Sequence, residues 1–161
     1  MRNFNKRNSL AMLFLCLITV ILSTSCSSKE SITINSVVNC SLNDIQFVMV
    51  SPEISYLDDC GYDVSTGQWA TIRQNEDIEK LYTAIGDVKV EDAGDFDVSL
   101  AGGTPRYVVY FLNNGTEIQM KLVDDMQVWI DGKAYNFRAG QSIYQEIDDV
   151  LENYAYEWKG E

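Results

Sequence analysis

Hydrophobic and polar positions alternate most clearly in the C-terminal half of the chain. A β-branched and aromatic run at residues 106–112 ends at Asn-Asn-Gly, and residues 116–122 then alternate apolar with polar side chains. Asn and Gly tolerate the positive φ of a two-residue hairpin, so this pattern predicts two strands joined by a tight turn. The strands predicted in the same way along the whole chain are residues 44–50, 68–73, 106–112, 116–122, 126–130 and 133–137.

Two other segments repeat apolar residues at helical spacing. The first begins near Asn75 and ends at Gly86. The second has Ser142 followed three residues later by Gln145, a capping-box pattern, and continues to about Tyr154. The sequence therefore predicts an α+β domain, in which two helices pack on one face of an antiparallel β-sheet meander whose other face is largely wet.

Residues 1–25 have the pattern of an export signal. Arg2, Lys6 and Arg7 precede an uncharged apolar stretch at residues 10–22. A helix of that length spans about 20 Å, which is too short for the roughly 30 Å hydrocarbon core of a bilayer. Basic residues, a short apolar stretch and then small residues are typical of a secretory signal peptide that is removed.

The last residues of this segment, Leu-Ser-Thr-Ser-Cys ending at Cys26, resemble the lipobox of bacterial lipoproteins. Family members usually have a large aliphatic residue three positions before the cysteine, where this chain has Ser23. The resemblance implies that Cys26 becomes the N-terminus, carries the lipid anchor and holds the chain in the cell envelope, facing outside the cytoplasm. Cleavage that leaves Cys26 unmodified is the alternative. Residues 26–39 are then the lipidated cysteine with a flexible tether, and residues 40–161 are a single domain.

Two cysteines, Cys40 and Cys60, remain after removal of the signal and lipidation of Cys26. Disulfides persist in exported proteins, and closing a loop of about twenty residues would contribute about 3 kcal/mol. Two thiols in a chain without histidine cannot fill a zinc shell. The sequence predicts a Cys40–Cys60 disulfide, with free thiols as the alternative.

The composition is strongly acidic, with 24 acidic residues, 12 basic residues, no histidine and a formal net charge of −12. Nucleic-acid binding needs clustered Lys and Arg, so this class of function is excluded. Anionic lipid headgroups would repel such a surface, which leaves the lipid anchor as the contact with the membrane. A basic protein or peptide is the partner that the charge favours.

Two candidate sites stand out from the pattern. The first is the loop that contains Asp92, Asp95 and Asp97, since calcium takes six to eight oxygen ligands; a solvated acidic loop without metal is the alternative. No other cofactor is indicated. The second is Trp129, which the alternation places on the opposite face of its strand from Val128. An aromatic residue there suits a partner contact, although it would equally cover the second side of the sheet.

These observations favour a lipid-anchored extracytoplasmic binding domain without enzymatic activity, with the sheet as its contact face. A carboxylate-based hydrolase acting on cell-wall or glycan substrates is the alternative, and a structural lipoprotein is a third interpretation. Acidic doublets such as Asp148-Asp149 are weak support for the hydrolase, because adjacent residues of a helix face different ways and do not hold two carboxyls at the spacing that glycoside cleavage needs.

Overall fold

The computed structural model describes residues 32–54, 67–94, 105–123, 126–138 and 143–159. The chain divides into two compact units, Met1–Glu30 and Ser31–Glu161, and every described residue belongs to the second. The predicted signal peptide and the site residues Cys26, Cys60, Asp95 and Asp97 lie outside the described residues.

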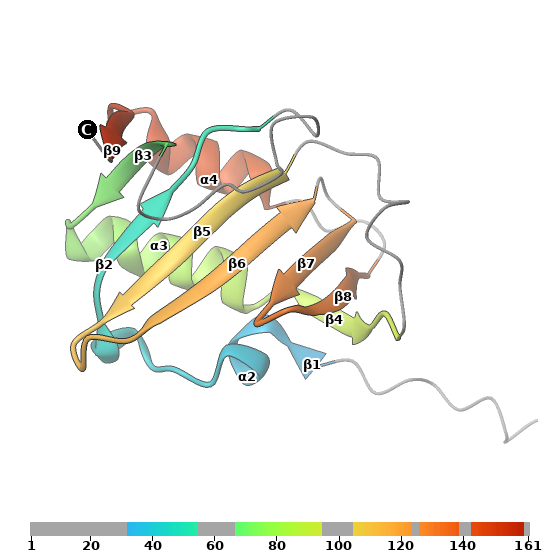
Figure 1. The fold of residues 1–161 in the computed structure, drawn as a ribbon. Coiled ribbons are helices and arrows are strands. Elements are labelled where there is room, and N and C mark those ends of the chain that lie inside the picture. The colour runs from blue at the N-terminus through green and yellow to red at the C-terminus, as the bar shows by residue number, and fades with distance from the viewer. Residues whose placement is uncertain (1–31, 55–66, 95–104, 124–125, 139–142, 160–161) are drawn as a thin grey trace, which may run out of the picture. The chain divides into compact units, whose positions relative to one another are not determined.

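The domain is built on a nine-stranded sheet in which every neighbouring pair of strands is antiparallel (Figure 1). The strand order is β1-β4-β8-β7-β6-β5-β2-β3-β9. The strands are β1 (Ile32–Thr33), β2 (Ile45–Val50), β3 (Gly67–Ile72), β4 (Lys89–Asp92), β5 (Pro105–Leu112), β6 (Glu117–Val123), β7 (Gln127–Ile130), β8 (Lys133–Phe137) and β9 (Glu157–Lys159). The predicted α+β class and the predicted meander, strands β5 to β8, are confirmed.

Positive φ angles fix the two hairpin turns of this meander. Gly115 has φ 83° between β5 and β6, while Asp131 and Gly132 have φ 49° and 77° between β7 and β8. Gly and Asp tolerate this left-handed conformation, which explains why these residues end the strands.

The helices are α2 (Ile34–Val38), α3 (Asn75–Gly86) and α4 (Tyr144–Leu151), with a 3₁₀ turn, η1 (Leu42–Asp44), between α2 and β2. The predicted bounds of α3 are confirmed. The predicted cap of α4 is wrong, because Ile143 occupies the N-cap position without a side-chain hydrogen bond, and the helix ends at Leu151. Among the described residues, no helix has the length and apolar character needed to cross a membrane.

The main hydrophobic core lies between the sheet and the helices. Both α3 and α4 run behind the sheet in Figure 1. Leu81 of α3 and Ile147 of α4 are fully buried in one cluster with Val108, Tyr110 and Leu122 of the sheet. The apolar stripe that predicted each helix is therefore the face that packs on the strands.

The opposite face of the sheet has a smaller apolar cluster and is not the largely wet surface that the alternation predicted. Its buried members are Met49, Ile54, Trp69, Tyr107 and Val109. Half-buried Phe47 and Phe111 stack against each other beside it, with ring centroids 4.4 Å apart. Aromatic side chains bury large areas, so this second cluster contributes to stability.

The structure differs from the predicted tether at the start of the domain. Ile32 of β1 pairs with Val90 of β4, and Ile34 of α2 is buried in the main core. Thr33 caps α2 by accepting a hydrogen bond from the Ser36 amide at 3.4 Å. Residues 32–39 are therefore part of the domain and not of a tether, because Ile34 and Val38 present one apolar face to the core.

Candidate functional site

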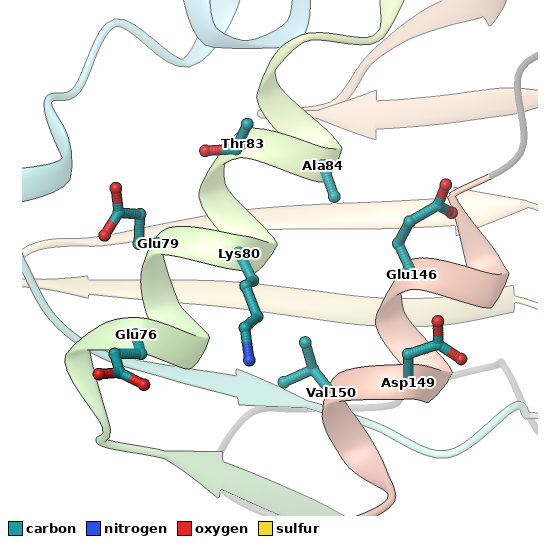
Figure 2. Close-up of a pocket in the computed structure, with 8 residues that line it drawn as sticks. All are labelled: Glu76, Glu79, Lys80, Thr83, Ala84, Glu146, Asp149 and Val150. Carbon is teal, nitrogen blue, oxygen red and sulfur yellow. The ribbon is translucent and has the colours of Figure 1, made fainter.

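A groove of about 810 Å³ lies between α3 and α4 (Figure 2). The described residues that line it all belong to these two helices. Helix α3 contributes Glu76, Glu79, Lys80, Thr83 and Ala84, and helix α4 contributes Glu146, Asp149 and Val150. Lys80, Ala84 and Val150 lie between the helices in Figure 2, while the carboxylates stand on the α3 side and the α4 side of them.

The helical repeat explains why acidic residues flank the groove. Ile78, Leu81 and Ile85 turn the apolar face of α3 toward the sheet, and Ile147 and Leu151 do the same for α4. Residues three or four positions apart share a face, so the remaining faces gather Glu, Asp and small residues. Two such helices side by side place four carboxylates around a partly apolar base.

These four carboxylates belong to Glu76, Glu79, Glu146 and Asp149, and all four residues are exposed. Asp149 accepts a hydrogen bond from Gln145 Nε2 at 2.8 Å. Within the described part of the chain, none of the four has an ion-pair partner. The groove therefore has an excess of negative charge that its own side chains do not neutralise.

Lys80, the one cation among the described lining residues, forms an ion pair with Asp77 on the same helix. Lys80 Nζ lies 3.2 Å from Asp77 Oδ1, and the Tyr154 hydroxyl donates to Asp77 Oδ2 at 2.7 Å. The hydrogen bond from Tyr154, followed by the effect of Lys80, lowers the pKa of Asp77. Burial, followed by the hydrogen bond to Asp77, raises the pKa of Tyr154 to about 12. Because Tyr154 follows α4, this contact ties the end of α4 to the start of α3.

We expect Tyr154→Phe to lower the free energy of unfolding by about 1 kcal/mol at neutral pH, since it removes one hydrogen bond to a carboxylate. A lowered folded pKa of Asp77 gives stability that is present above the ordinary value of about 3.9 and is lost as pH falls through the folded value. The raised pKa of Tyr154 gives stability that is present below a pH of about 10, the ordinary tyrosine pKa, and is lost as pH rises through the pKa of Tyr154 in the folded protein. Urea unfolding across pH should show the difference between wild type and Tyr154→Phe shrinking at both extremes. A difference that stays constant with pH would contradict the assignment.

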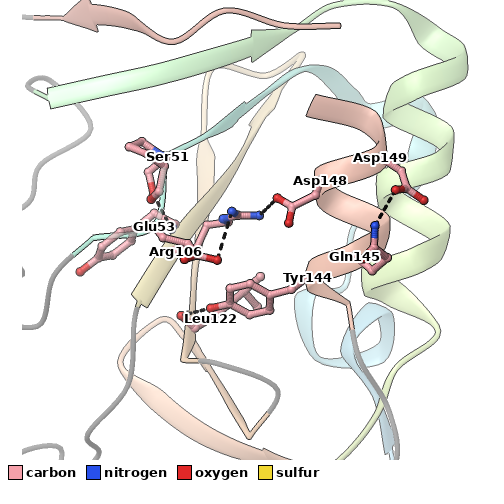
Figure 3. Close-up of polar contacts among 10 residues, drawn as sticks. Ser51, Glu53, Arg106, Leu122, Tyr144, Gln145, Asp148 and Asp149 are labelled. Carbon is pink, nitrogen blue, oxygen red and sulfur yellow. Dashed lines mark hydrogen bonds and ion pairs between the residues drawn. The ribbon is translucent and has the colours of Figure 1, made fainter. Parts of the chain in front are cut away.

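Arg106 fixes the wall of the groove that α4 forms (Figure 3). Its side chain, on β5, is only 5% exposed, and its Nη1 lies 2.7 Å from Asp148 Oδ1 of α4. Glu53 Oε1 lies 3.5 Å from its Nη2, and its guanidinium lies 5.1 Å from the centroid of the Tyr144 ring. A buried cation needs such partners, so Arg106 and Asp148 together hold α4 on the sheet.

The doublet Asp148-Asp149 behaves as helical geometry requires. Asp148 turns inward to Arg106, whereas Asp149 lines the groove on the other side of α4 (Figure 3). The two carboxylates do not converge, so the doublet forms no acid–base pair. The doublets Asp58-Asp59 and Asp124-Asp125 lie outside the described residues.

Trp129 lies on the second face of the sheet and is half-buried. In the sheet it is paired with Lys121 of β6 on one side and with Ala134 of β8 on the other. It also lines a cavity of about 140 Å³ together with Tyr107. Its indole nitrogen is buried and has no hydrogen-bond partner in the described structure. Trp129 therefore is not a projecting anchor, and a contact between this residue and a partner stays a prediction.

Asp92, the described member of the predicted calcium loop, already has two contacts. Its Oδ2 lies 2.7 Å from Lys133 Nζ, and its Oδ1 accepts a hydrogen bond from the Gly94 amide at 2.9 Å. No group of three or more metal-ligating side chains occurs among the described residues. Asp95 and Asp97 lie outside them, so calcium binding stays a prediction.

Cys40, the described member of the predicted disulfide, follows α2, is half-buried and has no disulfide partner among the described residues. Burial, followed by the charge of Asp44, raises the pKa of this thiol. Its carbonyl oxygen accepts a hydrogen bond from the Tyr82 hydroxyl at 2.9 Å. Cys60 lies outside the described residues, so the pairing of Cys40 with Cys60 stays a prediction.

Comparison of the chain with protein-family models, with curated proteins and with solved structures found no match. The chemistry of the groove is therefore the basis for a function.

Proposed function

We propose that this chain is a lipid-anchored extracytoplasmic binding domain without enzymatic activity, and that it binds a basic protein or peptide. The observation that supports the proposal is the groove between α3 and α4, where four exposed carboxylates stand around a partly apolar base and none of them has an ion-pair partner among the described residues. A surface of this kind attracts a positively charged partner over a distance and then orients it.

The contact surface is the helix face and not the sheet that the sequence favoured. The second face of the sheet packs Trp69 and Tyr107 into a cluster of its own, which leaves less of it for a partner. The helix groove is exposed and combines apolar surface with charge, which is the usual composition of a docking site. Binding there leaves the core undisturbed.

The proposed anchor at Cys26 suits this arrangement. Only residues 27–31 separate Cys26 from β1, and a chain segment of that length reaches at most about 18 Å when extended. The anchor would keep the domain close to the bilayer, where acidic side chains are repelled by anionic headgroups. A partner bound in the groove would therefore be a protein of the envelope or a peptide that passes along the membrane surface.

The geometry does not favour the hydrolase alternative. A carboxyl that serves as a general acid is usually buried or placed against a second carboxyl, which keeps it protonated near neutral pH. The groove carboxylates are exposed, and those of α3 and α4 stand on opposite sides of the groove in Figure 2. This arrangement suits recognition of positive charge better than proton transfer.

The test is capture of the partner from the native envelope with the intact lipidated protein. We expect a basic protein or peptide to remain with the wild type after mild detergent extraction and to dissociate at about 0.5 M salt, where the Debye length is only a few ångströms. Mass spectrometry of the mature N-terminus should show a diacylated Cys26, and Cys26→Ser should release the protein from the membrane fraction.

The control is a pair of variants with equal charge. In the groove variant, Glu76, Glu79 and Glu146 become Gln and Asp149 becomes Asn. In the matched variant, four acids on the strands and turns of the sheet are neutralised instead, namely Glu91, Glu117, Asp131 and Glu157. Loss of the partner from the groove variant alone supports the proposal. Equal retention by both variants, or a partner that is acidic or indifferent to salt, contradicts it.

A further inference from the structure

The groove has the dimensions and chemistry to select one kind of segment. We propose that it receives an amphipathic helix of the partner whose apolar stripe is flanked on both sides by Lys or Arg. This inference rests on the proposed function and specifies the form of the partner at the same site.

The volume of the groove is large enough for one face of a helix and too small for a whole domain. About 810 Å³ lies near the upper end of the range for ligand pockets, which is roughly 300–1,000 Å³. This space accepts several side chains in a row. It does not accept a whole helix, which is about 10 Å wide when its side chains are included. A helix would lie along the groove and insert only its apolar stripe.

The base of the groove accepts apolar side chains. Ala84 and Val150 lie between the two helices in Figure 2, and the small Ala84 leaves room for a larger side chain opposite it. Side chains of one helix pack into the spaces between the side chains of others, so a third helix can lie on α3 and α4 in the usual way. Leu or Ile at helical spacing supplies such a stripe.

The carboxylates on the two sides of the groove favour a positively charged partner. Glu76 and Glu79 stand on the α3 side, and Glu146 and Asp149 stand on the α4 side. A helix with basic residues on both flanks of its apolar stripe meets carboxylates on both sides at once. Lys80, the only cation among the described residues that line the groove, lies 3.2 Å from Asp77 and so repels such a helix less than a free ammonium would.

The experiment uses the mature domain and three synthetic peptides of about five helical turns. The first has a Leu stripe flanked by Lys, the second keeps the Lys residues but replaces Leu with Gln, and the third keeps Leu but replaces Lys with Glu. We expect the Leu/Lys peptide to become helical on binding, the Gln/Lys peptide to bind at least about tenfold more weakly, and the Leu/Glu peptide not to bind.

Protein variants assign the binding to the groove. Neutralising the four groove carboxylates should weaken binding of the Leu/Lys peptide at least about tenfold. The matched variant at Glu91, Glu117, Asp131 and Glu157 should change the affinity for this peptide by less than about threefold. Ala84→Gln leaves the charge unchanged but narrows the base of the groove. It should weaken binding of the Leu/Lys peptide and leave the weak binding of the Gln/Lys peptide unchanged. Urea unfolding of each variant confirms that the domain remains folded.

The outcomes separate this inference from the proposed function. Equal losses in the groove and matched variants, or equal binding of the Leu/Lys and Gln/Lys peptides, would mean that overall charge and not the groove attracts the peptide, and the inference would be overturned. The proposed function would be unaffected in that case if a basic partner is still captured from the envelope. A partner that contacts the groove through an extended segment would likewise overturn the inference and leave the proposed function intact.

Discussion

Asp148→Asn is expected to lower the free energy of unfolding by about 2 kcal/mol, whereas Asp149→Asn, one residue further along α4, should change it by no more than about 0.5 kcal/mol. Asp148 neutralises a guanidinium that is 5% exposed, and Arg106 Nε already has no hydrogen-bond partner in the described structure. Asparagine removes the charge but keeps the size of the side chain. Asp149 faces the groove, where water replaces what is lost. Urea unfolding of both variants measures the difference.

A substitution of Arg106, the other member of the ion pair, should have a smaller effect. An unpaired buried charge destabilises the fold, but this substitution removes the charge itself. Arg106→Met replaces the cation with an apolar side chain of similar length, and the two acids that it leaves, Glu53 and Asp148, are each 51% exposed and return to water. We expect a change within about 1 kcal/mol. The double variant Arg106→Met/Asp148→Asn should then be no less stable than Arg106→Met alone. If the two single losses simply add in the double variant, the ion pair is not what couples α4 to the sheet.

This pair also connects the fold to the proposed site. Asp148 and Asp149 are neighbours in sequence, yet one fixes α4 on the sheet and the other lines the groove. The position of one wall therefore depends on a contact on the far side of the same helix. Asp148→Asn should weaken binding in the groove even though Asp148 does not line it, because the wall that α4 forms is less firmly placed.

Local patterns predicted the elements whose partners are close in sequence. Alternation and turn chemistry located β5 to β8, since each strand pairs with the next one along the chain. Helix α3 was predicted with its correct bounds because its apolar stripe is regular and ends at Gly86. The short elements β1, α2, β4 and β9 were missed. Of these, β1 and β9 depend on pairing with β4 and β3, and β4 pairs with β8, which lies more than 40 residues further along the chain. A strand of two or three residues leaves too little pattern for sequence analysis to detect.

The groove could not be predicted for the same reason. Each of its carboxylates occupies an ordinary exposed helix position, and only the packing of α3 beside α4 brings them together. Arg106 did leave a signal that was not used. It stands in phase with Val108 and Tyr110, which face the helices, so the alternation places a charged residue on the buried face of its strand. A charge at such a position requires an acidic partner from a packed element.

The second face of the sheet gives the other large expected effect. Trp69→Ala should lower the free energy of unfolding by about 3–5 kcal/mol, the usual range for removing a buried tryptophan. Trp69 is completely buried against Met49 and Val109, although its strand lies next to the edge of the sheet. If this face were the wet contact surface that the alternation predicted, the same substitution would hardly change stability. Chemical unfolding distinguishes the two.

Trp158→Ala is the matched control, because Trp158 lies on the neighbouring strand β9 and is 70% exposed. We expect a change of no more than about 0.5 kcal/mol there. A small effect at both positions would mean that the second face is not a packed cluster, and the sheet would again be available as a contact surface. A large effect at Trp69 alone means that both faces of the sheet are engaged in the fold. The exposed side of the helices then remains available for the partner contact that we propose.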